Sequence, residues 1–444
     1  MPVVPGRPNL RFFESTIAII ATQILGLVSV FFLNLLIARN FGEAGKGYIS
    51  LLIYLAEILY AFSNLALGFT GQYFISKGLA PPRKLFSNVF VYSLSAGILV
   101  VGFFALTHSF WSGYLQDLSL KELLPALLVA LLLLIYEPCS QMLIALGKIG
   151  KRSAVVLSQN YLMLFSLMIL VWATTCQVQQ AAWLYVATYG VGALLAVVFL
   201  TREVGAPNQP SAEVFKSSMM YGGWIFAANF IGLLYARVDF FMLSALGSIE
   251  AAGVYSVAIG LTAPLMMVSL AVNTIFYPKT SSETDADAAV TTPFYYRQAL
   301  LVQLAGSIGL AIFARPVLSW YGAGFVDGII PMLILLIAAI GRGLNGILTL
   351  HILGRGKSFT KSLAMFSALC VAILLNYFLI PRYGMIGAAI ASSIAVVTEN
   401  LILTYLYQNL VHGRAADLYR FEKRDFTATI REAARFVGRL VSKQ

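Results

Sequence analysis

Charged residues are scarce in this sequence of 444 residues, at 11% of the chain, whereas soluble domains carry about a quarter. Hydrophobic residues make up 59% of the chain, and the mean hydropathy is +0.82. So little polar sequence cannot cover the buried helices of a large soluble protein, and this scarcity excludes that class. The composition predicts a polytopic membrane protein.

Cysteine and histidine are also rare, with three of each in the chain. Cys139, Cys176 and Cys370 are too scattered for a disulfide framework or a metal site, and the histidines do not cluster with them. The sequence also lacks a loop long enough to form a catalytic domain outside the membrane, which argues against a sugar polymerase or ligase. We therefore predict a protein that is not an enzyme and has no metal and no cofactor.

Long apolar runs fill the rest of the chain, and most have the roughly 20 residues that a helix needs to cross a bilayer. They predict an all-α membrane protein with twelve transmembrane helices in two pseudo-symmetric lobes of six. The predicted spans are residues 13–38, 48–75, 86–108, 122–146, 153–175, 181–201, 216–246, 251–276, 296–320, 329–353, 362–380 and 384–411.

An internal repeat supports the two lobes. Gly42 recurs as Gly247, 205 positions later, and the tripeptide at 146–148 (LGK) recurs at 353–355 (LGR), 207 positions later. Several such matches occur in the same order, with a drift of only two residues. Duplicated hydrophobic halves are typical of secondary transporters, in which two bundles move around a central site.

Charge placement predicts the orientation of the chain. With the N-terminus in the cytoplasm, 23 of the 30 Lys and Arg residues fall on cytoplasmic segments and four at the outer side. This positive-inside distribution predicts an inner-membrane protein with both termini in the cytoplasm. The net charge of +11 then reflects contact with anionic lipid, and nucleic acid is not an expected partner.

These features divide the chain into four predicted regions. They are an N-terminal six-helix lobe (1–201), a cytoplasmic linker rich in helix breakers (202–215), a C-terminal six-helix lobe (216–411) and a basic amphipathic cytoplasmic tail (412–444). The tail has apolar and arginine positions at helical spacing, typical of a helix on the inner leaflet. A plain solvated helix is the alternative. We expect a chain without the tail to insert its twelve spans and to lose little activity.

Charged groups within spans carry the functional prediction, because each is costly in hydrocarbon and should face a cavity or a partner. Arg342 lies near the middle of its span within a glycine-rich run, residues 341–346, where a ligand or a neighbouring helix can approach closely. Several arginines would suit a phosphate-bearing ligand. The candidate substrate-binding residues are Arg342, Arg237, Arg39, Arg315 and Asn345.

The spans also contain carboxylates, which leave a second interpretation open. Asp239, Glu57, Glu137 and Glu399 are candidates for ion coupling, or for internal salt bridges that neutralise the arginines. Arg237 and Asp239 are two residues apart, so they lie on different sides of a helix and need not pair with each other.

Four groups of motifs resemble bacterial polysaccharide flippases of the Wzx type, which share a superfamily with lipid II flippases and multidrug exporters. The family's penultimate loop is similar to residues 379–391 (LIPRYGMIGAAIA), and its first outer loop is similar to residues 38–42 (ARNFG) with 45–47 (GKG). Its seventh span with the following loop is similar to residues 237–239 (RVD) with 253–256 (GVYS), and its loop after span ten is similar to residues 353–355 (LGR).

This resemblance implies two six-helix lobes around a cationic central cavity. It also implies alternating-access export of a polyprenyl-diphosphate-linked oligosaccharide for O-antigen, capsule or exopolysaccharide synthesis, with membrane lipid and polysaccharide polymerase machinery as partners. Twelve spans rather than fourteen, and no arginine within span 13–38 before Arg39, depart from the lipid II branch. The alternative function is a cation-coupled multidrug exporter of the same fold, which would use the carboxylates instead of the arginines.

Overall fold

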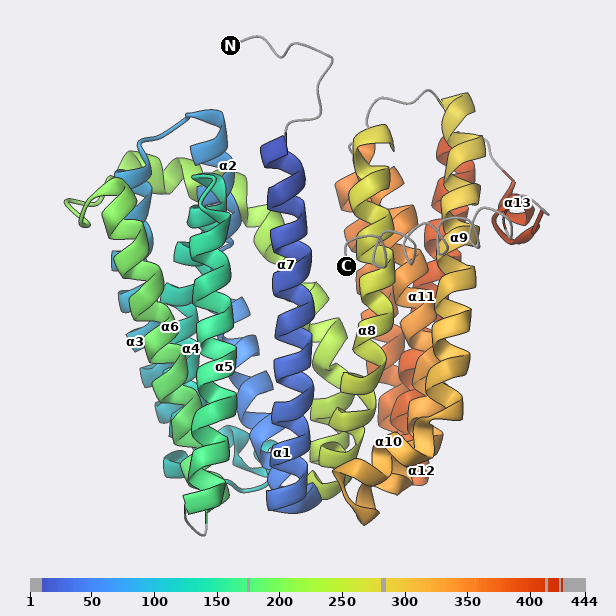
Figure 1. Cartoon of the computed structure of the whole chain (residues 1–444), viewed down its shortest axis with the longest axis horizontal. Helices are drawn as coiled ribbons and strands as arrows, with labels where there is room; N and C mark the ends of the chain where they lie inside the picture. Colours follow the sequence, from blue (N-terminus) through green and yellow to red (C-terminus); the bar gives the residue numbers. More distant parts are fainter. Residues whose placement is uncertain are drawn as a thin grey trace, which may run out of the picture. The chain divides into compact units, whose positions relative to one another are not determined.

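The computed structural model describes residues 10–173, 176–280, 285–355, 357–411, 414–422 and 425. These residues form α-helices joined by short turns and two 3-10 turns, and no strand occurs among them (Figure 1). The predicted all-α class is therefore confirmed. Long runs of apolar residues without charges form these helices because a helix satisfies all its backbone hydrogen bonds internally, as a membrane requires.

The chain divides into two compact units, Met1–Leu233 (unit 1) and Leu234–Gln444 (unit 2). The division falls within α7 (Ala212–Leu246), so this helix begins in unit 1 and ends in unit 2. The division between the units therefore lies after the predicted linker, residues 202–215, rather than within the linker.

Unit 1 is organised around α4, which packs against α1, α2, α3, α5 and α6. A capping box starts α4, in which the Glu122 carboxylate accepts a hydrogen bond from the Ser119 backbone nitrogen at 2.8 Å. The helices of unit 1 before α7 are α1 (Leu10–Ser63), α2 (Leu67–Lys77), α3 (Pro82–Trp111), η1 (Ser112–Leu115), α4 (Leu120–Ala145), α5 (Ile149–Ala173) and α6 (Val178–Val204).

Unit 2 is organised around α11, which packs against α8, α9 and α12. Its largest described core cluster contains Tyr296, Leu348, Ile352 and Tyr407, all fully buried. The helices of unit 2 after α7 are α8 (Ile249–Thr280), α9 (Asp285–Ile312), α10 (Ala314–Tyr321), η2 (Ala323–Gly328), α11 (Ile329–Gly354), α12 (Ser358–Val411) and α13 (Ala415–Tyr419).

The spans fit the predicted number once the breaks in the helices are considered. In the described part of the chain, nine helices are long and apolar enough to cross a membrane, and α9 with α10 forms a further span bent by 60°. Helices α1 and α12 each contain 54 residues and are kinked at Gly42 and Gly384, where φ is 67° and 53°. Each of these two helices therefore covers two predicted spans, which agrees with twelve in total.

The kinks also agree with the sequence repeat. Gly42 lies inside α1, whereas its repeat partner Gly247 lies in the turn between the separate helices α7 and α8. Conversely, Gly384 lies inside α12, and the residue 207 positions earlier, Gln177, precedes α6 after a break from α5. Each half of the chain thus turns at the same place in the repeat, by a glycine kink in one half and a loop in the other.

Two predicted spans are not continuous helices. Span 48–75 is interrupted where α1 ends at Ser63, because Leu65 and Ala66 adopt left-handed conformations, with φ of 46° and 56°, before α2 begins. Span 296–320 is interrupted between α9 and α10. The first interruption follows Ser63 and Asn64, and the second is followed by Arg315 and Pro316. Hydropathy averaged over a whole span does not show such short polar segments.

The linker between the repeats is bound to α3. The Asn208 backbone nitrogen donates to Ser87 Oγ at 2.8 Å. Asn88 Nδ2 donates to the Ser211 carbonyl oxygen at 3.0 Å, and the Ser211 backbone nitrogen donates to Asn88 Oδ1 at 2.7 Å. These hydrogen bonds fix the linker to unit 1 and explain why the compact units divide only later, within α7.

The start of the predicted tail is packed into unit 2 through a buried ion pair. Arg297 on α9 contacts Asp425 through two bonds, Nε to Oδ2 at 2.8 Å and Nη2 to Oδ1 at 3.3 Å, and the two side chains are 3% and 0% exposed. Helix α13 packs beside α9 (Figure 1). Its Leu418 side chain is fully buried in the core cluster. Residues 426–444, which include the predicted amphipathic helix, lie outside the described part.

The ion pair changes what we expect from deletion of the tail. A chain that ends at Gly413 leaves Arg297 buried without Asp425, which should lower the free energy of unfolding by about 3–5 kcal/mol. A chain that ends at Asp425 keeps the pair and should melt as the full chain does. Thermal unfolding of the purified proteins in detergent tests this prediction, and equal melting temperatures for the two truncations would contradict it.

Candidate functional site

A group of polar side chains lies in unit 2 on the membrane-spanning parts of α7, α11 and α12. It consists of Tyr235, Arg342, Asn345, Glu399 and Asn400, and is called the Arg342 cluster below. Apart from the half-buried Arg342, these side chains are buried. Polar groups at such positions require partners or a ligand.

Arg342 has an aromatic contact and an unused hydrogen-bond donor. Its guanidinium carbon lies 5.6 Å from the centre of the Tyr235 ring, within the range of a cation–π interaction. Its Nε atom is buried and has no hydrogen-bond partner in the structure. Buried donors are nearly always paired in folded proteins, so an unpaired one at a polar site indicates a group that a ligand can satisfy.

Glu399 is held by an amide. Asn345 Nδ2 donates to Glu399 Oε2 at 2.9 Å, and Asn400 Nδ2 donates to Asn345 Oδ1 at 2.8 Å. The Glu399 carboxylate also interacts electrostatically with Arg342 and Lys361. Among the described residues, however, no ion pair within 4.0 Å joins Glu399 to Arg342. The arginine and the carboxylate are therefore neighbours without being a salt bridge.

Asp239 belongs to a second buried group. Its Oδ2 atom accepts hydrogen bonds from the Tyr255 hydroxyl and from Ser392 Oγ, both at 2.8 Å, and its Oδ1 atom accepts one from the Phe240 backbone nitrogen at 2.8 Å. Three donors stabilise a buried carboxylate well. Tyr255 interacts electrostatically with Arg342, so this group and the Arg342 cluster lie in one polar region of unit 2.

Close packing of two helices positions the Arg342 cluster. A Cβ atom built on Gly341 would lie 2.5 Å from Val396 Cγ1 on α12, so this glycine allows α11 to approach α12. Ser393 Oγ donates to the Ile334 carbonyl oxygen at 2.9 Å and links the same helices. Of the two uses predicted for the glycine run, contact with a neighbouring helix is confirmed at Gly341.

The other predicted arginines lie on α1, α7 and α10. Arg39 is exposed on α1, shortly before the kink at Gly42, and Arg237 is half-buried on α7. Arg315 is exposed on α10, which packs near the start of α11. Arg342 lies 13 residues further along α11, or about 20 Å at the rise of an α-helix. Ligand contact by these three arginines remains a prediction.

Unit 1 contains the remaining predicted carboxylates. Glu57 on α1 and Glu137 on α4 both interact electrostatically with the Tyr189 hydroxyl on α6. Glu137 also interacts with Arg152 on α5, whose Nε atom is buried without a hydrogen-bond partner. Arg152 lies just before the predicted span 153–175, so a search for charges within the predicted spans does not identify it as a partner for Glu137.

Sequence reasoning also missed the tyrosines and the serine around the cluster. Tyr235 and Tyr255 occur in a chain with 22 tyrosines, and Ser392 lies among small residues. Tyr235 lies four positions before Asp239, which places both on one face of a helix. That spacing is the one signal that could have indicated Tyr235.

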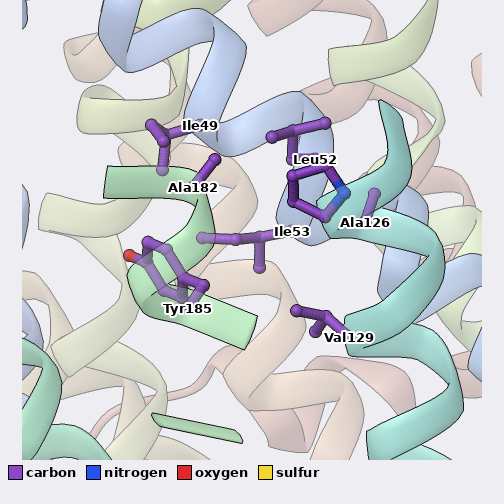
Figure 2. A pocket seen from close by; sticks show the side chains of 8 residues that line it. Ile49, Leu52, Ile53, Ala126, Val129, Ala182 and Tyr185 are labelled. Carbon is purple, nitrogen blue, oxygen red and sulfur yellow. The ribbon is translucent and has the colours of Figure 1, made fainter. Parts of the chain in front are cut away.

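A small pocket in unit 1 lies between α1, α4 and α6 (Figure 2). All its lining residues except Tyr185 are apolar; they are Ile49, Leu52, Ile53, Pro125, Ala126, Val129, Ala182 and Tyr185. It offers no charged group to a polar ligand, so it is not the candidate site. No cluster of three or more metal-ligating side chains occurs among the described residues.

The chain is similar to known proteins over most of its length. Residues 35–327 match the polysaccharide biosynthesis protein family, which is well over half of the chain. The chain belongs to this family. It is also 24% identical over 206 residues to a Shigella flexneri protein described as an O-antigen transporter. That alignment covers 45% of this chain and 48% of the relative, so it spans about half the length of each protein.

Solved structures of membrane transporters share the fold. The lipid II flippase MurJ in its inward closed conformation has a TM-score of 0.75 at 13% identity, covering 94% of this chain and 92% of that one. An inward-facing multidrug transporter of the MATE family has a TM-score of 0.69 at 12% identity, covering 87% and 95%. The family match and these folds confirm the resemblance found in the sequence motifs.

Gly341 offers a test of how the cluster is positioned. Ala normally stabilises a helix interior relative to Gly by up to about 1 kcal/mol. At Gly341 the added methyl group should instead cost about 1–3 kcal/mol because it overpacks the contact with Val396. Gly309→Ala on α9, where nothing lies within 4 Å of the added atom, is the matched control. Thermal unfolding of both variants gives the comparison, and equal melting temperatures would contradict close packing at Gly341.

Proposed function

We propose that this chain moves a polyprenyl-diphosphate-linked oligosaccharide from the inner to the outer leaflet of the cytoplasmic membrane by alternating access. Membership of the polysaccharide biosynthesis family and the transporter fold support the class of substrate and the class of process. The observation that carries the proposal is Arg342, a half-buried guanidinium in a membrane-spanning helix with an unused, buried donor.

The chemistry of the substrate matches such a site. A diphosphate headgroup is too polar to cross hydrocarbon unaided, whereas a prenyl tail can remain in lipid. A guanidinium is always charged and presents planar pairs of donors that fit phosphate oxygens. Contact with the Tyr235 ring fixes the position of the Arg342 guanidinium. This arrangement lowers the cost of placing a diphosphate within the membrane, while amides and hydroxyls nearby suit a sugar.

The proposal includes an orientation. With both termini in the cytoplasm, the 23 to 4 division of cationic residues between cytoplasmic and outer segments obeys the positive-inside rule. Polysaccharide polymerase machinery would then consume the product at the outer side. Removal of the product, or coupling to an ion, would give transport its direction.

A second candidate function is a cation-coupled multidrug exporter. The buried carboxylates Asp239 and Glu399 favour it, because exporters of this kind require anionic groups within the spans. The fold shared with the MATE transporter is compatible with it. In this function Arg342 would serve only as a neighbour that stabilises Glu399.

Substitution of Arg342 separates the two functions. In cells that depend on this chain for surface polysaccharide, Arg342→Ala should abolish the polysaccharide. Arg342→Lys should restore only part of it, because an ammonium keeps the charge but loses the planar contact. Arg382→Ala, at an exposed arginine of α12, is the matched control. Membrane abundance is measured in the same cells, because removal of a cation that neighbours the buried Glu399 carboxylate also destabilises the protein.

Two outcomes would contradict the flippase. Normal polysaccharide from Arg342→Ala at normal abundance would exclude a diphosphate contact at this residue. Export that survives in the Arg342 variants, together with loss of cationic-dye efflux in Glu399→Gln, would favour the exporter.

A further inference from the structure

The C-terminal segment, residues 414–422 and 425, is bound to the end of unit 2 by more than the ion pair described above. Gln298 Nε2 donates to the Asp425 carbonyl oxygen at 2.8 Å, and the Arg297 guanidinium also donates to the carbonyl oxygen of Asp417. Leu418 is fully buried. A segment held by a charge pair, backbone hydrogen bonds and a core side chain is an integral part of unit 2.

A chain of hydrogen bonds runs from this segment to the Arg342 cluster. The Tyr419 hydroxyl donates to Asn400 Oδ1 at 3.1 Å. Asn400 Nδ2 then donates to Asn345 Oδ1 at 2.8 Å, and Asn345 Nδ2 donates to Glu399 Oε2 at 2.9 Å. This series from Tyr419 to Glu399 is called the relay below. The side chain of Tyr296 supports it, because its hydroxyl lies 3.0 Å from that of Tyr419.

The relay determines which end of the Asn345 amide faces Glu399. Because the Asn345 oxygen accepts from Asn400, the nitrogen is directed to the carboxylate. Without that donor, the Asn345 amide is held only through its nitrogen, which donates to Glu399 and, at 3.4 Å, to the Val396 carbonyl oxygen, so its position is less fixed. A less fixed amide holds Glu399 less tightly, so that the carboxylate can turn to a stronger donor. Arg342, which already interacts electrostatically with Glu399, is such a donor.

We propose that the C-terminal segment acts as a positioning element for the transport site, because its relay holds Glu399 on Asn345 and so leaves Arg342 available to an anionic ligand. Tyr419, Asn400 and Asn345 are the positioning residues. Disruption of the relay allows Glu399 to compete with the ligand for the guanidinium. This inference rests on the proposed role of Arg342 in binding a diphosphate.

Binding of farnesyl diphosphate to the purified full-length chain in detergent tests the relay. Tyr419→Phe removes the hydroxyl that bonds to Asn400 and to Tyr296 and should weaken binding about three-fold. Asn400→Leu removes the donor to Asn345 and should weaken binding about ten-fold. The ring of Tyr419 still packs edge-on against Tyr296 after the change. Tyr405→Phe, at an exposed tyrosine of α12, is the matched control and should bind as the parent chain does.

A double-mutant comparison separates positioning from a general loss of structure. In a Glu399→Gln background no carboxylate remains to compete for Arg342, so adding Tyr419→Phe or Asn400→Leu should leave the affinity of that background unchanged. A purely structural role predicts the same fold-loss in both backgrounds, and that result would overturn the proposal. Melting temperatures are measured for every variant, so that any loss of binding is compared at known stability.

Arg342→Ala distinguishes failure of the relay from failure of the proposed function. Loss of farnesyl diphosphate binding in Arg342→Ala, with unchanged binding in Tyr419→Phe and Asn400→Leu, would overturn the relay and leave the proposed function standing. Unchanged binding in Arg342→Ala would overturn both.

Discussion

A charged side chain inside a membrane span must be stabilised without bulk water, and this constraint governs the polar interior of the protein. Asp239 meets it with three donors, and Glu399 meets it with an amide and two neighbouring cations. Arg297 meets it with a buried carboxylate from the end of the chain. Arg342 differs, because an aromatic face covers part of its guanidinium while its Nε atom stays without an acceptor.

The duplicated sequence provides two units built alike, yet their interiors have diverged. Each unit has one central helix, α4 or α11, that packs against most of the others, and the two helices end at matching points of the repeat. In unit 1 the central helix carries a carboxylate, Glu137, and in unit 2 it carries the cation Arg342. A common scaffold thus holds opposite charges, as expected when function depends on a few side chains placed on a shared fold.

Sequence alone was sufficient for the fold because hydropathy, repeat spacing and breaker residues are local signals that a membrane makes decisive. It predicted the all-α class and the number of spans. It missed the left-handed corner at Leu65 and Ala66, where the turn is marked by Asn64, which accepts from the Ala66 backbone nitrogen, and not by a glycine or proline. It also did not single out Arg297, since positive-inside counting records the side of the membrane on which a charge lies and not whether the charge is buried.

The candidate site was less predictable, because it depends on contacts between residues far apart in the chain. The sequence identified Arg342, Asn345 and Glu399 as costly polar groups, but their relation follows from hydrogen bonds that span more than fifty positions. Tyr419 lies in a tail that composition describes only as basic, so no pattern connected it to the site. The role of Tyr419 follows from its tertiary contacts and not from local sequence preference.

The amide nitrogen of Asn345 and the Nε atom of Arg342 illustrate how stability and function are balanced at this site. The amide nitrogen is paired with Glu399, which removes the partner that the guanidinium would otherwise take. The unpaired Nε of Arg342 costs the folded state about 1–3 kcal/mol, the usual penalty for a buried donor without an acceptor. Proteins tolerate such violations mainly at functional sites. A phosphate oxygen would relieve this penalty only while the ligand is bound, so the same feature that weakens the empty protein would strengthen binding.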